Sequence, residues 1–211
     1  MVALNSEKTK KIKIVVFDLG GVLFEYATLK AAKVLSEKYN YKKKIILNLL
    51  QSKKSRALRE GKISDKDFWN YAKKIVPKNY YTKIIKKVWD GCSEINRKVF
   101  KIVKELSKNK KVKLMIFSGN VRTRIKALDK KYNFRRYFYK EVYSFNHKIN
   151  KPKTKFVRIM IEQAGVNPEE ILYIEDNPVY AEPARKLGVN VVIFKNAKQL
   201  KKELKNFGLW I

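Results

Sequence analysis

The sequence KIKIVVFDLGGVLFE, residues 11–25, contains a short apolar run that ends abruptly at Asp18. The run at residues 12–17 is rich in β-branched side chains and too short for a helix, which predicts a buried strand. Open α/β sheets bind ligands at the carboxyl edge of their strands, where Asp18 lies. Gly20 and Gly21 let the backbone turn sharply after it. On these residues alone, an aspartate that merely opens a turn is the simpler interpretation. Polar residues at the ends of three further predicted strands favour a functional site instead.

Length and composition indicate one globular domain, or one domain with an insert. The chain has 211 residues, of which 45% are hydrophobic, enough for a core. The longest apolar runs, residues 114–117 and 191–194, are too short to cross a bilayer. Residues 1–11 are polar and lysine-rich, unlike a secretory signal, and Cys92 is the only cysteine. We therefore expect a cytoplasmic protein with no membrane association, no internal disulfide and no thiolate metal cluster.

The charge of the chain is strongly positive, with 50 Lys and Arg against 19 Asp and Glu, or +31. Such a field attracts polyanions. The basic residues are spread along the whole chain, and no nucleic-acid-binding motif accompanies them. We interpret them as solvated faces that steer an anionic substrate and allow non-specific polyanion binding. An A+T-rich genome is an alternative origin, because Ile, Asn, Tyr and Phe are also frequent.

Strand-like and helix-like segments alternate over most of the chain, which predicts a parallel sheet. The fold class is therefore α/β, with a Rossmann-like sheet covered by helices on both faces. The predicted strands span residues 12–17, 112–117, 139–143, 171–174 and 191–194. The predicted helices span residues 28–39, 95–107, 121–132, 154–164 and 179–187, with a terminal helix at residues 198–206 after the last strand.

One block departs from this alternation, because residues 42–89 are helical in pattern throughout. We predict a helical insert at residues 26–92 within an α/β core formed by residues 1–25 and 93–211. Ser64 is the expected N-cap of one of its helices. The apolar positions expected to face the interior of the insert include Leu29, Ala32, Leu35, Tyr39, Trp69, Tyr81, Ile85 and Trp89.

Polar residues follow the predicted strands at four places: Asp18, Ser118, Lys151 and the pair Glu175 and Asp176. The carboxyl ends of parallel strands share one edge, so these groups are expected to converge. Carboxylates that meet there repel unless a cation separates them, which indicates Mg²⁺. The cation favours a phosphate, with Ser118 and Lys151 as donors to its oxygens. Taken singly, Ser118 is more often a turn-former or helix N-cap than a ligand. Lys151 alone is consistent with a solvated surface lysine, and Glu175 and Asp176 with an acidic turn.

In their order along the chain, these segments resemble the haloacid dehalogenase-like superfamily, whose hydrolases form an aspartyl-phosphate. The resemblance rests on FDLGGVLF at residues 17–24, the strand that ends in Ser118, Lys-Pro at residues 151–152, IEDN at 174–177 and ARKLGV at 184–189. The insert, with REGKIS at residues 59–64, is similar to the small helical cap of that superfamily.

The resemblance implies that Asp18 attacks phosphorus and forms a covalent aspartyl-phosphate, which water later hydrolyses. It also implies a Mg²⁺ site formed by Asp18, the backbone carbonyl of Gly20, and Asp176. Glu175 stands where the family often has Asp, and its longer side chain is expected to orient the neighbouring groups instead of binding the metal.

The substrate phosphate would bind to the residues that follow the second strand and to the predicted lysine. Lys151 would also act in catalysis, because its ammonium neutralises charge on the nucleophile and the phosphate. The implied substrate-binding set is Ser118, Gly119, Asn120 and Lys151.

One position departs from the pattern of most phosphatases of the superfamily, which carry a second Asp two residues after the nucleophile. This chain has Gly20 there, and a missing general acid–base forfeits about 10²–10⁴ in rate. The resemblance is therefore to the subgroup of glucose-1-phosphate phosphatases and epoxide-hydrolase N-terminal phosphatases. Substrates with good leaving groups, such as anomeric sugar phosphates or acyl phosphates, need proton donation least. Glu25 is a candidate substitute acid.

The function expected from the sequence is a Mg²⁺-dependent phosphatase acting on a small phosphorylated metabolite, with a sugar phosphate as the candidate that the subgroup implies. A 2-haloacid dehalogenase-type hydrolase and a non-catalytic protein that binds nucleic acid are the alternatives. His147 is expected in a loop outside the site. Both a monomer and a homodimer remain open.

Overall fold

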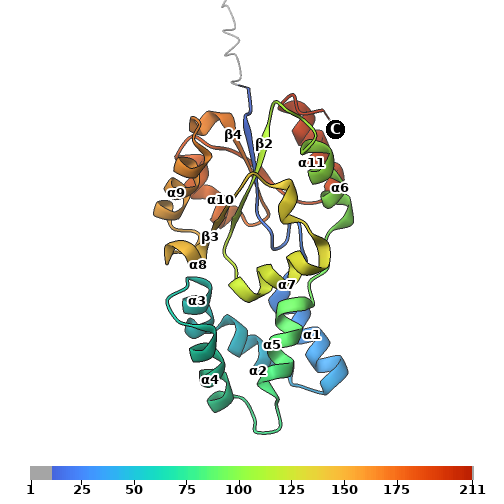
Figure 1. The fold of residues 1–211 in the computed structure, drawn as a ribbon, viewed down its shortest axis with the longest axis vertical. Helices are drawn as coiled ribbons and strands as arrows, with labels where there is room; N and C mark the ends of the chain where they lie inside the picture. The colour runs from blue at the N-terminus through green and yellow to red at the C-terminus, as the bar shows by residue number, and fades with distance from the viewer. Residues whose placement is uncertain (1–10, 211) are drawn as a thin grey trace, which may run out of the picture.

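The computed structural model describes residues 11–210, which form a five-stranded parallel sheet with helices on both faces (Figure 1). The strand order is β3-β2-β1-β4-β5, so the strand that ends at Asp18 is central. The strands are β1 (Ile14–Phe17), β2 (Lys113–Ser118), β3 (Lys140–Tyr143), β4 (Ile171–Glu175) and β5 (Asn190–Ile193). The predicted α/β class, with an all-parallel sheet, is confirmed.

Alternate residues of each strand face opposite layers of helices, as the strand period of two requires. Val15 and Phe17 pack with α6 (Arg97–Leu106), α7 (Arg122–Tyr132) and α11 (Ala197–Asn206). Ile14 and Val16 pack on the other face, with α9 (Thr154–Ala164) and α10 (Pro178–Lys186). Asp18 follows Ile14 and Val16 at the same period of two, so its side chain is directed to the face of the sheet that α9 covers.

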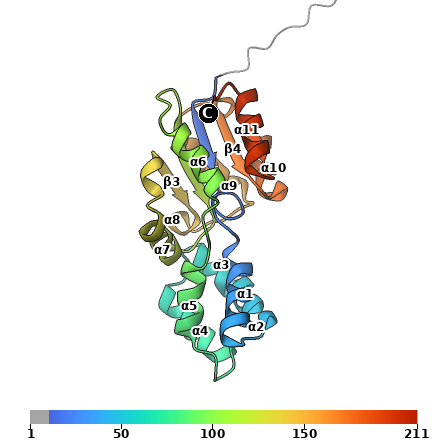
Figure 2. The ribbon, with the colours of Figure 1, turned by 90° about the vertical axis from the view of Figure 1, so that its right-hand side faces the viewer.

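A group of helices lies beyond one end of the sheet (Figures 1 and 2). They have a hydrophobic cluster of their own, in which Trp89 and Phe68 are fully buried and Trp69 nearly so. The role of Trp69 and Trp89 in packing is thereby confirmed, whereas a separate domain at residues 26–92 stays a prediction. The helices are α1 (Ala27–Tyr39), α2 (Lys43–Gln51), α3 (Lys53–Arg59), α4 (Asp65–Ile75) and α5 (Thr82–Gly91).

Two helix faces differ from the predicted ones. In α1 the buried residues are Ala31, Ala32 and Leu35, whereas Leu29 is 56% exposed and lines a cavity at the sheet edge. Tyr39, near the end of the same helix, is also exposed. In α5, Tyr81 is the exposed N-cap residue, because the helix turns Ile85 and Trp89 toward the interior instead.

The structure also contains short elements that the sequence pattern did not predict. His147 lies in a one-turn helix, α8 (Ser144–His147), and not in a loop; four residues are too few to show a helical period. Two 3₁₀ turns, η1 (Arg135–Tyr137) and η2 (Pro168–Glu170), precede β3 and β4. Ser64 does cap α4, in a reciprocal capping box with Asp67. No helix within residues 11–210 has the length and apolar character needed to cross a membrane.

Candidate active site

The register of the two central strands places Asp18 beside Glu175. Phe17 pairs with Ile174, and the backbone N–H of Asp18 donates to the carbonyl of Ile174 at 3.0 Å. The next residue on each strand is therefore a carboxylate at the carboxyl edge of the sheet. Tyr173 lies two residues before Glu175, on the same face, and its side chain packs in the cluster under α9.

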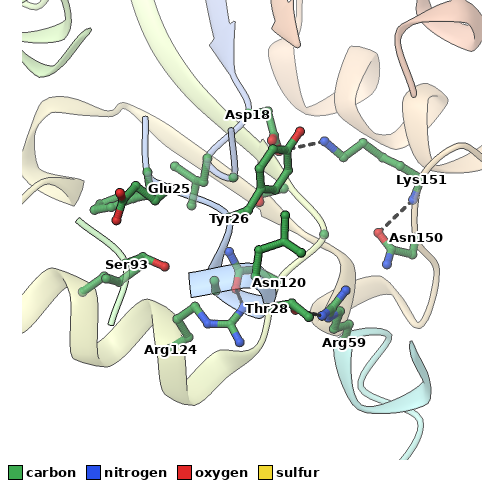
Figure 3. A pocket seen from close by; sticks show the side chains of 18 of the residues that line it. Asp18, Glu25, Tyr26, Thr28, Arg59, Ser93, Asn120, Arg124, Asn150 and Lys151 are labelled. Carbon is green, nitrogen blue, oxygen red and sulfur yellow. Dashed lines mark hydrogen bonds and ion pairs between the residues drawn. The ribbon is translucent and has the colours of Figure 1, made fainter. Parts of the chain in front are cut away.

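Lys151 joins these groups from the turn that precedes α9. Its Nζ donates to Asp18 Oδ1 at 2.7 Å (Figure 3). It also donates to Glu175 Oε2 at 2.6 Å and to the Tyr173 hydroxyl at 3.1 Å. The Tyr173 hydroxyl donates in turn to Glu175 Oε2. The Lys151 side chain is only 4% exposed, so this is a buried network and not a surface ion pair.

Three carboxylates gather at this point and form a candidate cation site. One oxygen each from Asp18, Glu175 and Asp176 lies within 4.8 Å of the others. Lys151 balances one of the three negative charges, which leaves two for a divalent cation, and hard cations prefer oxygen ligands. Glu175 is already engaged by Lys151, and its second oxygen accepts the N–H of Asn177 at 3.1 Å. Asp18 and Asp176 therefore have the greater capacity left for a metal.

The surroundings raise the pKa of all three of these groups, the two aspartates and the lysine, for different physical reasons. Burial raises the pKa of Asp18 to about 7, although the charge of Lys151 acts against the rise. Burial also raises the pKa of Asp176. For Lys151, burial lowers the pKa, but the charges of Asp18 and Glu175 outweigh it and raise the pKa above its ordinary value. The neighbouring carboxylates thus favour the protonated, cationic form of the lysine.

Gly21 and Tyr26 determine where the Asp176 carboxylate can lie. The Tyr26 hydroxyl donates to Asp176 Oδ2. A Cβ at Gly21 would stand 2.2 Å from the same oxygen, and the residue has a φ of +85°, which side chains rarely adopt. Only glycine at this position lets the Asp176 carboxylate approach the loop after β1.

The residues proposed to bind phosphate border one cavity of about 330 Å³ together with Asp18 and Lys151. Ser118, at the end of β2, is 2% exposed, and its hydroxyl makes no hydrogen bond with another residue of the described chain. A Cβ at Gly119 would stand 2.1 Å from Asn150 Oδ1, so a larger residue there would displace the Asn150 side chain. The Asn120 side-chain oxygen is already used, because it accepts from Val121 N at 2.9 Å and from Arg124 Nη1 at 3.1 Å.

The space beside Gly20, where most phosphatases of the superfamily carry the acid, is not occupied by another side chain of residues 11–210, and Glu25 does not reach it. A Cβ at Gly20 would meet nothing within 4 Å. The Glu25 carboxylate accepts from Lys30 Nζ and from the backbone N–H of Glu94, both at 3.2 Å. Figure 3 shows Glu25 on the opposite side of the cavity from Lys151. These partners hold Glu25 away from the buried network, so the structure gives the substitute-acid hypothesis no support.

Five residues at the site have no role in the sequence prediction. Tyr26, Arg59, Arg124 and Asn150 line the cavity, and Tyr173 completes the network around Lys151. The strand period could have identified Tyr173, because it precedes Glu175 by two residues. The other four lie in loops and helices whose approach to the sheet edge depends on tertiary packing. Arg59 begins the REGKIS segment, but that motif gave no site role to it.

A parallel sheet with an acidic, lysine-linked cavity at its carboxyl edge is the arrangement of an α/β enzyme. A family model described as haloacid dehalogenase-like hydrolase matches residues 15–194. The chain belongs to this family of hydrolases, and the superfamily expected from the sequence motifs is confirmed; the subgroup is not resolved.

Relatives and solved structures agree with this assignment. An uncharacterized protein of Dictyostelium discoideum is 32% identical over 210 residues, which cover 87% of this chain and 91% of the relative. A HAD family enzyme of Bacteroides thetaiotaomicron, solved in complex with magnesium and inorganic phosphate, has a TM-score of 0.70 at 22% identity, covering 87% of this chain and 94% of its own. The L-2-haloacid dehalogenase of Xanthobacter autotrophicus has a TM-score of 0.64 at 20% identity, covering 92% and 83%. At these identities the two structures show the shared fold alone.

Proposed function

We propose that the protein is a Mg²⁺-dependent phosphatase that hydrolyses a small phosphorylated metabolite through an aspartyl-phosphate on Asp18. The observation that carries the proposal is the buried network in which Lys151 links Asp18 to Glu175, with Asp176 completing the acidic cluster. Ser118 and Gly119 border the same cavity, which supports their assignment as the phosphate-binding end.

Each buried side chain then has a defined task. Lys151 fixes one carboxylate oxygen of Asp18 by a hydrogen bond of 2.7 Å, which leaves the other oxygen to attack phosphorus. Its ammonium offsets the negative charge that accumulates as nucleophile and phosphate meet. Glu175 and Tyr173 hold that ammonium from the other side, so its position does not depend on substrate. Water then hydrolyses the aspartyl-phosphate and restores the carboxylate.

The acidic cluster fits a divalent cation, as its net charge and oxygen ligands indicate. Asp18, Asp176 and the backbone carbonyl of Gly20 would hold Mg²⁺, which supplies neutralisation of the phosphate charge when bound. The Bacteroides thetaiotaomicron enzyme, which was solved with magnesium and inorganic phosphate, supports this choice by analogy.

Because Gly20 carries no carboxyl group and Glu25 is held elsewhere, the described site lacks an evident acid for the leaving oxygen. We therefore infer a preference for good leaving groups, such as anomeric sugar phosphates or acyl phosphates, over plain alkyl phosphates. A screen in which alkyl phosphates are turned over faster than anomeric ones would contradict the inference.

The dehalogenase alternative is supported by the likeness to the Xanthobacter autotrophicus structure, which is a likeness of fold. A carbon–halogen bond is broken without a phosphate to neutralise, so that reaction gives no reason for three converging carboxylates. Nucleic-acid binding through the basic surface stays an untested prediction, as do the cytoplasmic location and the oligomeric state.

The test is hydrolysis of p-nitrophenyl phosphate with and without Mg²⁺, in parallel with chloride release from 2-chloropropionate. We expect Mg²⁺-dependent phosphate release that Asp18→Asn abolishes, and no chloride release. Asp65→Asn is the matched control, because Asp65 lies on α4 and pairs with Lys86. Metal-independent chloride release by the wild type would favour the dehalogenase instead.

A further inference from the structure

Two arginines, Arg59 and Arg124, line the cavity at its end away from Lys151 (Figure 3). Arg59 is the last residue of α3, in the helical group, whereas Arg124 lies in the first turn of α7, against the sheet. Arg124 is only 5% exposed. The cavity thus places Asp18 and Lys151 at one end and two guanidinium groups at the other.

Neither guanidinium group is saturated by hydrogen bonds. Arg124 donates to the carbonyl of Trp89 at 3.1 Å and to Asn120 at 3.1 Å, and its Nη2 is buried without a partner. Arg59 donates to Thr28 Oγ1 at 3.1 Å and to the Leu50 carbonyl at 3.3 Å, and its Nε is likewise buried without a partner. Buried donors without acceptors are uncommon because each forfeits its solvation.

Their charges are also uncompensated. Neither guanidinium forms an ion pair with a carboxylate of residues 11–210. Asp90 is the acidic residue whose negative charge is felt by Arg124. Its carboxylate already accepts from Lys86 Nζ at 2.9 Å and from Thr123 Oγ1 at 3.0 Å. Burial, with a smaller contribution from the positive charge of Arg59, lowers the pKa of Arg124 to about 9. Two unpaired cations in a buried pocket are costly unless an anion joins them.

A purely structural role explains only part of this arrangement. Both guanidinium groups lie over the Trp89 ring, at 4.4 Å for Arg124 and 5.7 Å for Arg59, and the bond to the Trp89 carbonyl ties α7 to α5. A single neutral donor could make that bond. It would not explain two charges, two free N–H groups, or the Ser93 hydroxyl, which lines the same cavity, is 1% exposed and also has no partner.

We propose that Arg59 and Arg124 bind a second anionic group of the substrate, so that the enzyme acts on small phosphorylated acids. This inference rests on the proposed phosphatase function for the other end of the cavity. Planar guanidinium groups match carboxylates and phosphates by paired hydrogen bonds, and the carboxylate and the second phosphate share this chemistry. A cavity of about 330 Å³ admits a substrate of a few carbon atoms between the two ends.

The test uses unreactive phosphonates, so that binding is measured separately from turnover. Phosphonoacetate, 3-phosphonopropionate and 4-phosphonobutyrate are titrated into the wild type with Mg²⁺ by calorimetry, and compared with methyl-, ethyl- and propylphosphonate. Methylene- and ethylenediphosphonate form the arm for a second phosphate. We expect at least one acid to bind about tenfold more tightly than the alkylphosphonate that lacks its carboxylate, as charge-assisted hydrogen bonds predict.

Two variants and a control decide where the gain originates. Arg59→Gln and Arg124→Lys are expected to reduce the preference for the acid several-fold. Arg56→Gln, an exposed arginine of the same helix α3, is expected to retain it. Absence of any preference for acids, or a preference that survives both substitutions, overturns the inference. The phosphatase proposal fails separately if the wild type releases no phosphate from p-nitrophenyl phosphate.

Discussion

Replacing Gly20 with aspartate is expected to convert the site into one with a general acid. Gly20 borders the cavity beside Asp18, and a Cβ added there would meet nothing within 4 Å. The position does not have the positive φ found at Gly21, so an aspartate adds no backbone strain of that kind. The new carboxyl group would therefore enter the cavity without displacing the buried network.

The size of the effect follows from the leaving group. Positioned general acid–base catalysis contributes about 10²–10⁴ in rate, which corresponds to roughly 3–5 kcal/mol of barrier. The full gain should appear with ethyl phosphate, whose alkoxide leaves poorly without a proton. With p-nitrophenyl phosphate the leaving group is stable as an anion, so the gain should be small.

The assay is kcat/KM for both substrates at saturating Mg²⁺, in Gly20→Asp and in the wild type. Gly91→Asp is the matched control, because a Cβ at Gly91 also meets nothing within 4 Å and Gly91 lies at the end of α5, outside the cavity. An unchanged ratio of the two kcat/KM values, in a Gly20→Asp variant that folds and binds Mg²⁺, would refute the role assigned to the missing acid.

Three further perturbations probe the network and the acidic cluster. Lys151→Met leaves two buried carboxylates unpaired and should lower the free energy of unfolding by about 3–5 kcal/mol in urea titrations without metal; a change below 1 kcal/mol, roughly the value of an exposed pair, would contradict a buried network. Gly21→Ala should weaken Mg²⁺ binding about tenfold or more in calorimetry, because its Cβ would stand 2.2 Å from Asp176 Oδ2. Gly165→Ala is the control, because Gly165 has a similar positive φ of +68° but an added Cβ would meet no atom within 4 Å. We expect this variant to keep its Mg²⁺ affinity. Equal losses of Mg²⁺ affinity in Gly21→Ala and Gly165→Ala would refute the steric cause. Mg²⁺ at 100 times its Kd should stabilise the fold by about 2.7 kcal/mol, measured as a rise in Tm that EDTA reverses; the same rise in Asp176→Asn would be inconsistent with the proposed site.

The regular elements were predictable because they are periodic. Helix α9 (Thr154–Ala164) begins and ends where its spacing predicts, and Gly165 closes it in the left-handed conformation. The central strand is shorter than predicted by two residues at its start, where Lys13 breaks the apolar run. These signals are local, so the sequence carries them without knowledge of the fold.

The candidate site was predictable only where a residue ends a strand. Asp18, Ser118 and Glu175 follow from that rule, since strands of a parallel sheet share an edge. The contacts of Arg59 and Arg124 do not, because they depend on how α3 packs against α2 and how α5 packs against α7. The exposure of Leu29 has the same origin, since α1 overhangs a cavity that its own sequence does not reveal.

The most direct test of the account is the position of a bound divalent ion. Mn²⁺ serves as an anomalous-scattering substitute for Mg²⁺ in crystals of the protein. We predict a single anomalous peak that oxygen atoms of both Asp18 and Asp176 approach within about 2.0–2.3 Å. A peak bound by only one of these carboxylates, or no peak between them at saturating Mn²⁺, would contradict the shared metal site on which the proposed phosphatase depends.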